Sequence, residues 1–528
     1  MKLRIQNLRQ LPPEASLTAL VAERLAVSAE EVLSVEVVKS SVDSRRHRPI
    51  RVYTLDVEVA SPEPVLARFR ADPQIAPAPA PREGFYQGPL KRLGSQPLVV
   101  GTGPAGLFAT LALIEKGYRP LVIERGKPVR PRWKDVNAYW NHGRLDPESN
   151  VVFGDGGAGT FSDGKLYTRR KDPRNTHILE VLAELGRAPD ILVEGRPHLG
   201  TNRLSRVLLR LHQRLTEAGV EVRFGSRLDD LVIESGRIRG AIVNGERIET
   251  DTVFLASGHS ARDVYRMLHA RGVVLEARPF AVGARAEHPQ VLINQAQRGT
   301  ATPDTGPADY MMAYNDEKRG RSAYTFCMCP GGEVVGAGTE DDGLTVNGMS
   351  YSNRADRFGN SAIVATVTPA DFGGLGPLAG IEFQRRLEVA AYRAGGGGHV
   401  APAQRISDFL SGHPSSGSIE TSYRRGVAAS DLTALLPSPV VSVMRRGIRS
   451  FGRLMKGFDG AEGVLIGVET RTSSPVRVLR DPGTHESVNV AGLYPLGEGA
   501  GYAGGIMSSA SDGLRAVERV ESASGTST

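Results

Sequence analysis

Apolar and polar residues follow one especially clear pattern between residues 98 and 126. The apolar run LVV leads into the glycine-rich turn GTGPAG, then into a helical stretch that is apolar on almost every side, and finally into the apolar strand LVIE, which ends at Glu124. Short strands that are apolar throughout are typical of parallel sheets, whose strands are buried on both faces. The pattern therefore predicts a strand, turn, helix and strand at the centre of an α/β domain.

The remaining pattern divides the chain into further domains. Strand-like runs and one helical pattern, opened by Ser16 as an N-cap, indicate a small N-terminal α+β domain. Six prolines between residues 73 and 97 cannot continue a helix or a central strand, so a stiff linker is expected there. The predicted parts are the N-terminal domain (1–72), the linker (73–96), a central domain in two pieces (97–269 and 481–528) and an α+β domain inserted between them (270–480).

Composition indicates a globular protein that does not depend on disulfides. The chain has 528 residues, a formal net charge of +7 and 61 glycines. Its two cysteines, Cys327 and Cys329, cannot form a disulfide framework, and the N-terminus has no apolar signal segment, so we expect a reducing, cytoplasmic location. The net charge is modest for this size, and we expect neither a nucleic-acid partner nor an integral membrane segment. We expect no metal site, because no metal-ligand spacing occurs in the sequence.

The turn after the first strand has the spacing of a dinucleotide-binding motif. Gly101 suits the tight turn, Gly103 the close approach of backbone to a pyrophosphate, and Gly106 the close packing of the helix. The start of that helix directs N–H donors at phosphate groups. Glu124 lies where a carboxylate can accept hydrogen bonds from ribose hydroxyls. A glycine turn without a ligand is the alternative, and the complete unit favours a dinucleotide without choosing between NAD and FAD.

Two later segments favour an extended flavin nucleotide. FGDGGAGTFSDGKL, residues 153–166, can wrap a cofactor with backbone donors. LYPLGEGAGYAGGIMSSASDGLRA, residues 493–516, predicts a strand that ends near Glu498 and a helix that begins near Gly505. Such a helix would direct its N-terminal donors at the N1/C2 carbonyl edge of a flavin or at the pyrophosphate.

These segments, with the strand FLASG at 254–258, resemble the glutathione-reductase-like FAD-binding fold. More narrowly, SNVVFGDGGAGTFSDGKL, YTFCMCPGG, APAQR and GVETRTSSPVR resemble the bacterial family of FAD-dependent dehydrogenases, also described as NAD(FAD)-utilising dehydrogenases. The resemblance implies an α/β protein with a Rossmann-like FAD-binding domain, an inserted substrate-side α+β domain and the small N-terminal domain. It also implies FAD as cofactor and an oxidoreductase that transfers hydride between flavin N5 and a small-molecule substrate.

The resemblance assigns cofactor-binding residues by their place in the motifs. The glycine turn and Glu124 would hold the ADP half, the 157–162 segment would lie near the ribityl chain and flavin, Glu498 would bind ribityl or phosphate-side groups, and the 504–506 segment would meet the isoalloxazine ring. The full set is Gly101, Gly103, Pro104, Ala105, Gly106, Glu124, Arg125, Gly157, Ala158, Gly159, Thr160, Phe161, Ser162, Gly258, Gly497, Glu498, Gly504, Gly505 and Ile506.

Catalytic candidates come from the polar segment GVETRTSSPVR, residues 467–477. Arg471, Glu469 and Ser473 could form a polar wall, in which Arg471 clamps a substrate carboxylate or stabilises a reduced flavin anion. A buried structural ion pair between Glu469 and an arginine is an equally good interpretation. The electron partner stays open, with NAD(P)H one candidate. The second glycine-rich segment, VVGAGTEDDG at 334–343, lacks a third glycine, and no dedicated nicotinamide domain is expected.

Four other features carry weaker expectations. Cys327 and Cys329 would share one face of a strand at the edge of disulfide reach, and we favour simple packing. His259 and His288 are expected to be structural. The basic segment 444–458 is expected to be a helix that packs against its own domain. The basic hairpin tip at 43–49 is expected to be solvated. Two alternative functions stay open. The protein could be a flavin monooxygenase, or a flavoprotein that modifies or binds RNA.

Overall fold

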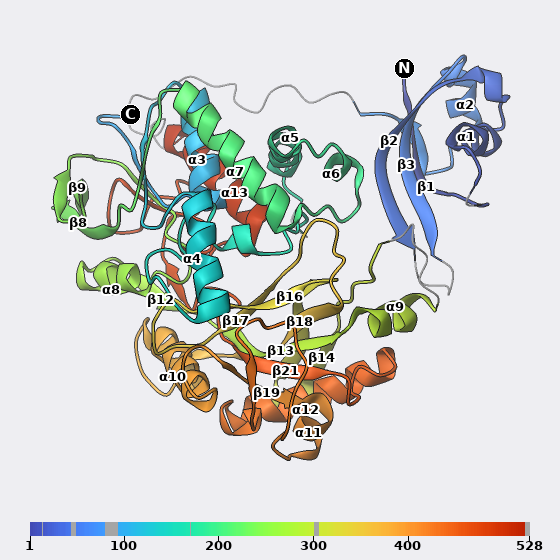
Figure 1. Ribbon diagram of the computed structural model, residues 1–528. Helices are drawn as coiled ribbons and strands as arrows, with labels where there is room; N and C mark the ends of the chain where they lie inside the picture. Colours follow the sequence, from blue (N-terminus) through green and yellow to red (C-terminus); the bar gives the residue numbers. More distant parts are fainter. Residues whose placement is uncertain (13, 44–48, 80–92, 169–170, 300–305, 523–528) are drawn as a thin grey trace.

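The computed structural model describes residues 1–12, 14–43, 49–79, 93–168, 171–299 and 306–522. Figure 1 shows a small N-terminal domain at the upper right, an α/β domain at the upper left, and a domain built on a large sheet below it. The chain passes from the upper domain into the lower one and returns for its last strand and helix. The two larger domains are therefore interleaved along the sequence.

The N-terminal domain is a four-stranded antiparallel sheet covered by two helices. Its strands lie in the order β2-β3-β1-β4, and Ser16 caps the first helix by accepting a hydrogen bond from the Ala19 N–H at 3.1 Å. The predicted basic hairpin tip, residues 45–48, lies outside the described residues. The elements are β1 (Leu3–Arg9), α1 (Leu17–Leu25), β2 (Val32–Asp43), β3 (Ile50–Val59), α2 (Pro62–Arg68) and β4 (Ile75–Pro77).

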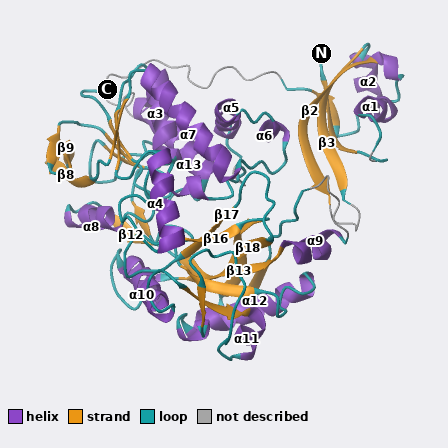
Figure 2. Ribbon diagram, in the orientation of Figure 1, coloured by secondary structure: helices purple, strands orange, loops and turns teal. Residues whose placement is uncertain are grey.

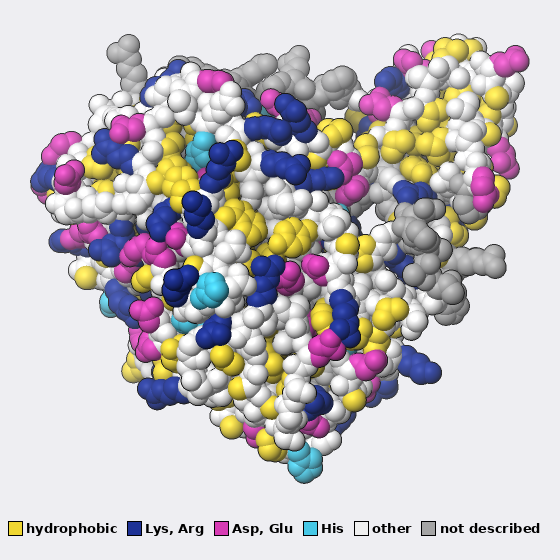
Figure 3. Space-filling view, viewed as in Figure 1, with side chains coloured by type: hydrophobic (Ala, Val, Ile, Leu, Met, Phe, Trp, Pro, Cys, Tyr) yellow, Lys and Arg dark blue, Asp and Glu magenta, His cyan; other side chains and the backbone are white. Residues whose placement is uncertain are grey.

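A groove separates part of this domain from the rest of the protein, and Figure 3 shows the hollow between them. The groove is polar and is lined from both sides, by Lys39 and Arg9 of the N-terminal domain and by Arg196 and Arg354 of the body. At its edge the Gly195 N–H donates to the carbonyl of Ser40 at 2.6 Å.

The α/β domain is built on a five-stranded sheet with every neighbouring pair parallel. Its order, β23-β11-β5-β6-β7, places the C-terminal strand at one edge, beside β11. The sheet confirms the predicted α/β class. The strands are β5 (Leu98–Val100), β6 (Leu121–Glu124), β7 (Glu221–Phe224), β11 (Val253–Leu255) and β23 (Leu493–Pro495).

Helices cover one face of this sheet and a small antiparallel sheet covers the other (Figure 2). Because both faces are covered, the apolar strands found in the sequence are fully buried. The helical face holds α3 (Pro104–Glu115), α5 (Arg174–Gly186), α7 (Gly200–Glu217) and α13 (Ile506–Ser522), with α4 (Val129–His142) and the short α6 (Asp190–Val193) beside them. The opposite face holds β8 (Leu228–Glu234), β9 (Arg237–Val243), β10 (Glu246–Ile248) and α8 (Arg262–Ala270).

The lower domain is a seven-stranded mixed sheet in the order β14-β15-β18-β13-β21-β19-β20. Residues 444–454 of the basic helix predicted at 444–458 belong to α12, which ends at Leu454, so the predicted helix is four residues too long at its end. Ile448 and Phe451 of α12 are fully buried in the domain core, so its packing role is confirmed. The elements are β13 (Phe280–Pro289), α9 (Gln290–Arg298), β14 (Ala313–Asp316), β15 (Arg321–Cys329), β18 (Phe358–Val367), α10 (Ala379–Ala394), β19 (Ala401–Arg405), α11 (Ile406–Ser411), β20 (Val427–Ala429), α12 (Ser438–Leu454) and β21 (Val464–Glu469).

Two small antiparallel pairs complete the sheet domain and its junction. Strands β12 (Leu275–Ala277) and β22 (Val476–Val478) pair where the chain enters and leaves it. Strands β16 (Glu333–Gly336) and β17 (Val346–Met349) form a hairpin that contains the second glycine-rich segment. This antiparallel context is not the strand-turn-helix of a nucleotide motif. In the part of the chain that the structure describes, no helix has the length and apolar character needed to cross a bilayer.

The close packing of α3 on the glycine turn yields a stability prediction. A Cβ atom at Gly106 would collide with the carbonyl oxygen of Gly101, which is backbone and cannot swing aside. Gly106→Ala should therefore lower the free energy of unfolding by about 1–3 kcal/mol, measured by urea unfolding. Gly103→Ala is the control, because its Cβ would meet no heavy atom within 4 Å. Equal stability of the two variants would contradict this packing.

Candidate functional site: a cavity between the parallel sheet and the large sheet

A single cavity collects residues from both larger domains. It is lined by the carboxyl ends of the parallel strands, by the 157–165 loop, and by residues of β15 and the segment after β21. Ligands of open α/β sheets bind at this end of the strands. The predicted cofactor residues that line it are Gly101, Gly103, Pro104, Ala105, Glu124, Arg125, Gly157, Ala158, Gly159, Ser162, Gly258, Glu498, Gly505 and Ile506.

The other predicted cofactor residues lie behind the lining. Gly106 packs against the Gly101 backbone, and the Gly497 N–H donates to Asp512 at 2.8 Å. Thr160 donates its hydroxyl to the carbonyl of Asp155, and Phe161 packs edge-on against two tryptophans. Gly504 is next to the lining without being part of it. These residues shape the cavity from outside.

The glycine turn leaves space where a pyrophosphate could approach the protein backbone. Gly103 is the N-cap residue of α3 and has an ordinary φ of −71°, and a Cβ built on it would point into open space. The first residues of α3, Pro104 and Ala105, line the cavity as well. Since the first N–H groups of a helix have no partners inside it, this end presents donors and a partial positive charge to the cavity.

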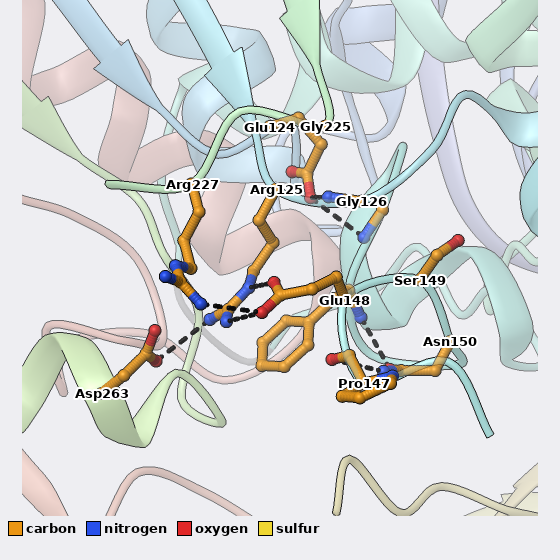
Figure 4. Close-up of polar contacts among 12 residues, drawn as sticks. Glu124, Arg125, Gly126, Pro147, Glu148, Ser149, Asn150, Gly225, Arg227 and Asp263 are labelled. Atoms are coloured by element: carbon orange, nitrogen blue, oxygen red, sulfur yellow. Dashed lines mark hydrogen bonds and ion pairs between the residues drawn. The ribbon is translucent and has the colours of Figure 1, made fainter. Parts of the chain in front are cut away.

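Glu124 has a different set of partners from the one predicted. One carboxylate oxygen, Oε2, accepts from both the N–H and the hydroxyl of Thr102 at 3.0 Å, and Oε1 accepts from the N–H groups of Gly126 and Gly154 at 2.9 and 3.0 Å. Four donors use about the full capacity of a carboxylate. Glu124 therefore anchors the glycine turn to two neighbouring loops, and Figure 4 shows its contact with Gly126. The predicted ribose contact would have to displace one of these donors.

Arginine and phenylalanine side chains form the end of the cavity beside Glu124. Arg125 donates to Glu148 at 2.6 Å and to Asp263 at 3.0 Å, and Arg227 approaches the same glutamate at 3.2 Å (Figure 4). The Arg125 guanidinium lies 4.2 Å from the ring centroid of Phe153. Because carboxylates balance both arginines, this end offers planar, nearly neutral surfaces that suit an aromatic base.

The 150–162 loop is fixed by an arginine that the sequence interpretation missed. Arg132 of α4 is fully buried and donates to the carbonyls of Asn150, Val151 and Gly157 at 2.8, 2.9 and 3.0 Å. Burial lowers the pKa of Arg132 to about 10. Its donors tie the loop to the short 3-10 helix at Gly157–Phe161, so Gly157 and its neighbours present their backbone to the cavity in a fixed shape.

The three catalytic candidates are not brought together. Arg471 lines the cavity, whereas Glu469 and Ser473 do not. Glu469 pairs with the fully buried Arg285 at 3.0 Å behind the wall, which matches the structural alternative, although with an arginine outside the segment. The wall of the cavity here consists of Arg471 and Thr472, together with Asn347, which had no signal in the sequence.

Arg471 is held in place by a buried carboxylate from the large-sheet domain. Glu388 of α10 accepts from Arg471 at 2.9 and 3.0 Å and from Arg262 of α8 at 2.9 Å. Burial alone would raise the pKa of Glu388, but the two arginines lower it to about 2. This ion triad crosses the boundary between the domains, so it fixes the wall and the domain junction together.

A carboxyl group that can exchange protons near neutral pH lies in the cavity. Burial raises the pKa of Glu498 to about 7, although a hydrogen bond from the Gly505 N–H opposes the rise. His259, which also lines the cavity, has its pKa lowered to about 4 by burial, and its Nε2 lies 3.9 Å from Glu498 Oε1. At neutral pH a neutral imidazole thus faces a half-protonated carboxyl. A group of this pKa suits general acid–base chemistry.

The histidine and cysteine candidates that remain are either buried or line the cavity. His288 is fully buried, stacks on Phe458 and bonds its carbonyl at 2.8 Å, so its structural role is confirmed. Cys329 is buried as expected, but Cys327 lines the cavity beside Lys165. The expectation that both cysteines merely pack is therefore wrong for Cys327. Lys165 belongs to the motif SDGKL, which carried a signal for the cofactor segment but none for the lysine itself.

The ion triad predicts a stability loss with a defined pH dependence. Glu388→Gln should cost about 3–5 kcal/mol at neutral pH, because two buried arginines lose their shared partner. The folded pKa lies below the unfolded value of 4.5, so the contribution is complete above 4.5 and is lost as the pH falls through about 2. The free energies of unfolding of wild type and variant should therefore differ by the same amount from neutral pH down to about 5, and they should converge only in stronger acid.

A matched control lies on the same helix. Glu382 of α10 pairs with Arg266 at 2.9 Å, with both side chains about half exposed. Glu382→Gln should change stability by less than about 1 kcal/mol, as exposed ion pairs do. If Glu388→Gln were no worse than this control, the triad would not hold the junction.

Comparisons with known proteins found a family model, relatives by sequence and distant structural neighbours. A family model described as FAD-dependent protein, C-terminal domain-like, matches residues 279–472. An uncharacterized protein of Clostridium beijerinckii is 41% identical over 528 residues, 98% of each chain. A thiamine thiazole synthase of Aeropyrum pernix is 29% identical over 207 residues, 36% of this chain and 64% of that enzyme. Among solved structures, the glycine oxidase of Bacillus cereus shares 10% identity over 81% of this chain and 95% of its own, with a TM-score of 0.36.

The match to the clostridial protein extends over nearly every residue of both chains, and the family model covers most of the large-sheet domain described above. Full-length identity at this level is shared by members of one family. The chain therefore belongs to the same family as this clostridial protein, and its residues 279–472 match the model of the C-terminal domain of FAD-dependent proteins.

Proposed function

We propose that this protein is an oxidoreductase that holds FAD along the cavity. The observation that carries the proposal is the continuity of the lining, which begins at the open Gly103 turn and ends at the Arg471 wall of the second domain. The residues fit the pyrophosphate of FAD, because the space that a Gly103 Cβ would take is empty and the N-terminus of α3 begins beside it. The match of residues 279–472 to a model of FAD-dependent proteins supports the same cofactor.

Each part of the cavity suits one part of FAD. Arg125, Phe153 and Arg227 offer planar surfaces for the adenine, and the α3 N-terminus offers donors for the pyrophosphate. The start of α13, at Gly505 and Ile506, and the opposite wall at Arg471 and Thr472 would enclose the isoalloxazine. When bound, the flavin supplies two-electron transfer at its N5 atom.

The chain's own residues would bind the substrate and move protons. Arg471 keeps a fixed guanidinium at the wall through Glu388 and can bind a substrate carboxylate or an anionic reduced ring. Glu498 can give or take a proton near neutral pH because of its raised pKa. We propose an organic small molecule as substrate, with NAD(P)H as a candidate electron donor that would reach the flavin without a second nucleotide motif in the 334–343 hairpin.

The first experiment is an absorbance spectrum of the purified protein, with the heat-released cofactor identified by mass. The expected result is a flavin spectrum and the mass of FAD. Anaerobic addition of NADH or NADPH then tests the electron donor, because reduction bleaches the flavin absorbance. A colourless protein that cannot be reconstituted with FAD would refute the proposal.

Gly103→Val should remove FAD while leaving the fold intact. The added methyl groups would occupy the space kept for the pyrophosphate, and the ordinary φ at this position accepts valine. We expect FAD affinity to fall by roughly two orders of magnitude or more, about 2.7 kcal/mol, with little change in thermal unfolding. Both quantities can be measured on one preparation by absorbance and circular dichroism.

The matched control is Gly374→Val in an exposed loop, where a Cβ would make only an ordinary contact at 3.6 Å with Ala379. This variant should retain the yellow cofactor. A Gly103→Val protein that stays as yellow as the control would place the pyrophosphate elsewhere.

A further inference from the structure

The two cysteines lie at a β-bulge that gives them different environments. The pairing of β15 with β18 shifts between Phe326 and Cys329, and Cys327 has a φ of +48°, in the left-handed region that side-chain-bearing residues rarely adopt. The strand alternation that predicted one shared face is therefore broken. Cys327 is partly exposed and lines the cavity, whereas Cys329 is fully buried. Backbone strain of this kind tends to persist at functional sites.

One buried arginine holds both cysteines. The Nη2 group of Arg285 donates to the carbonyl of Cys327 at 2.6 Å and to the Sγ of Cys329 at 3.4 Å. Glu469 and Asn360 fix the other side of the guanidinium, at 3.0 and 2.8 Å. The bulge is thus a rigid arrangement that holds a partly buried thiol beside a fully buried one.

The local charges distinguish the two thiols. A hydrogen bond from Cys329 lowers the pKa of Cys327 well below its usual range; burial opposes this, and Lys165 and Arg285 reinforce it. The same thiol–thiol contact and burial raise the pKa of Cys329. The acidic groups facing Cys327 act in the opposite direction to the two cations; they are Asp163, Glu469 and Glu498.

A partly buried thiolate that lines a cavity, next to a fully buried thiol, is the arrangement of an attacking and a resolving cysteine. Lys165 strengthens it from the cavity side, since its ammonium pairs with Asp163 at 2.8 Å and also donates to the carbonyl of Met328, between the two cysteines. Packing alone would account for Cys329 but not for a Cys327 that has a left-handed φ and lines the cavity.

We propose that Cys327 and Cys329 are a redox-active pair that exchanges two electrons with the flavin. This inference rests on the proposed FAD site. In the oxidative direction the Cys327 thiolate and the Cys329 thiol form one S–S bond, releasing two electrons and the proton of Cys329. The oxidised flavin accepts both electrons and that proton, so charge and atoms balance. In the opposite direction the reduced flavin cleaves the disulfide and restores a thiolate and a thiol.

The test is an anaerobic reductive titration of the diamide-oxidised holoprotein with dithionite, followed by absorbance and by intact mass. Wild type should take four electrons per bound flavin, two for the flavin and two for the disulfide, and oxidation should lower the mass by two hydrogens. Cys329→Ala and Cys327→Ser should each take two electrons and still bind FAD.

The outcomes separate this inference from the proposed function. A yellow wild-type protein that takes only two electrons, with no mass change on oxidation, would refute the cysteine pair and leave the FAD site standing. A protein that cannot hold FAD would refute both. Equal electron counts in wild type and Cys329→Ala would also overturn the pair.

Alkylation kinetics test the roles of the two thiols without relying on turnover. In the reduced holoprotein, iodoacetamide should modify Cys327 before Cys329, with a pH midpoint below the usual thiol value of about 8.5. Cys329→Ala removes the thiol donor and should raise that midpoint, whereas Cys329→Ser keeps a donor and should raise it less. A Cys327 that reacts with an ordinary midpoint in all three proteins would contradict its role as the attacking thiolate.

Discussion

The carboxylate of Glu388, buried between Arg262 and Arg471, is the interaction on which the architecture of the site depends. Arg262 belongs to the α/β domain and Glu388 to the large-sheet domain, so the triad joins two bodies whose chain segments are interleaved. Buried charges are tolerated only when they are paired, which makes the relative position of the domains specific. The same carboxylate orients Arg471 at the cavity wall. The residue that joins the two domains is therefore also the one that positions the cavity wall.

From this junction the cavity gains two chemically different walls. The α/β side supplies mostly backbone, at the open turn of Gly103, the helix start behind it and the rigid loop held by Arg132, and it adds a few side chains such as Arg125 and Glu498. The large-sheet side supplies side chains, namely Arg471, Thr472 and Cys327. Backbone donors suit a phosphate-rich cofactor that is always the same, whereas side chains suit a substrate and its reaction. This division accords with a cofactor held by the first domain and chemistry completed by the second.

The sequence could predict the parts of the site that are local in the chain. The strand, the glycine turn, α3 and Glu124 lie within about thirty residues, and their spacing has one structural solution. The partners of Arg471 and Glu469 could not be found in this way, because Glu388 and Arg285 are far away in sequence and meet them only through tertiary packing. The bulge at Cys327 was missed for a related reason: a strand pattern of period two carries no mark of the register shift with β18. Glu124 was located correctly by its motif, yet its four protein donors come from residues that the motif does not specify.

The central claim is that the cavity holds FAD along its whole length, from the Arg125 end to the Arg471 wall. Titration calorimetry of the flavin-free protein with FAD and with FMN tests it most directly, because FMN lacks the adenine and one phosphate that the Arg125 end and the α3 N-terminus would bind. The account predicts one FAD per chain, bound at least about a hundredfold more tightly than FMN. Equal affinity for the two flavins would mean that the glycine turn and the arginine end bind no part of the cofactor, and it would contradict the account.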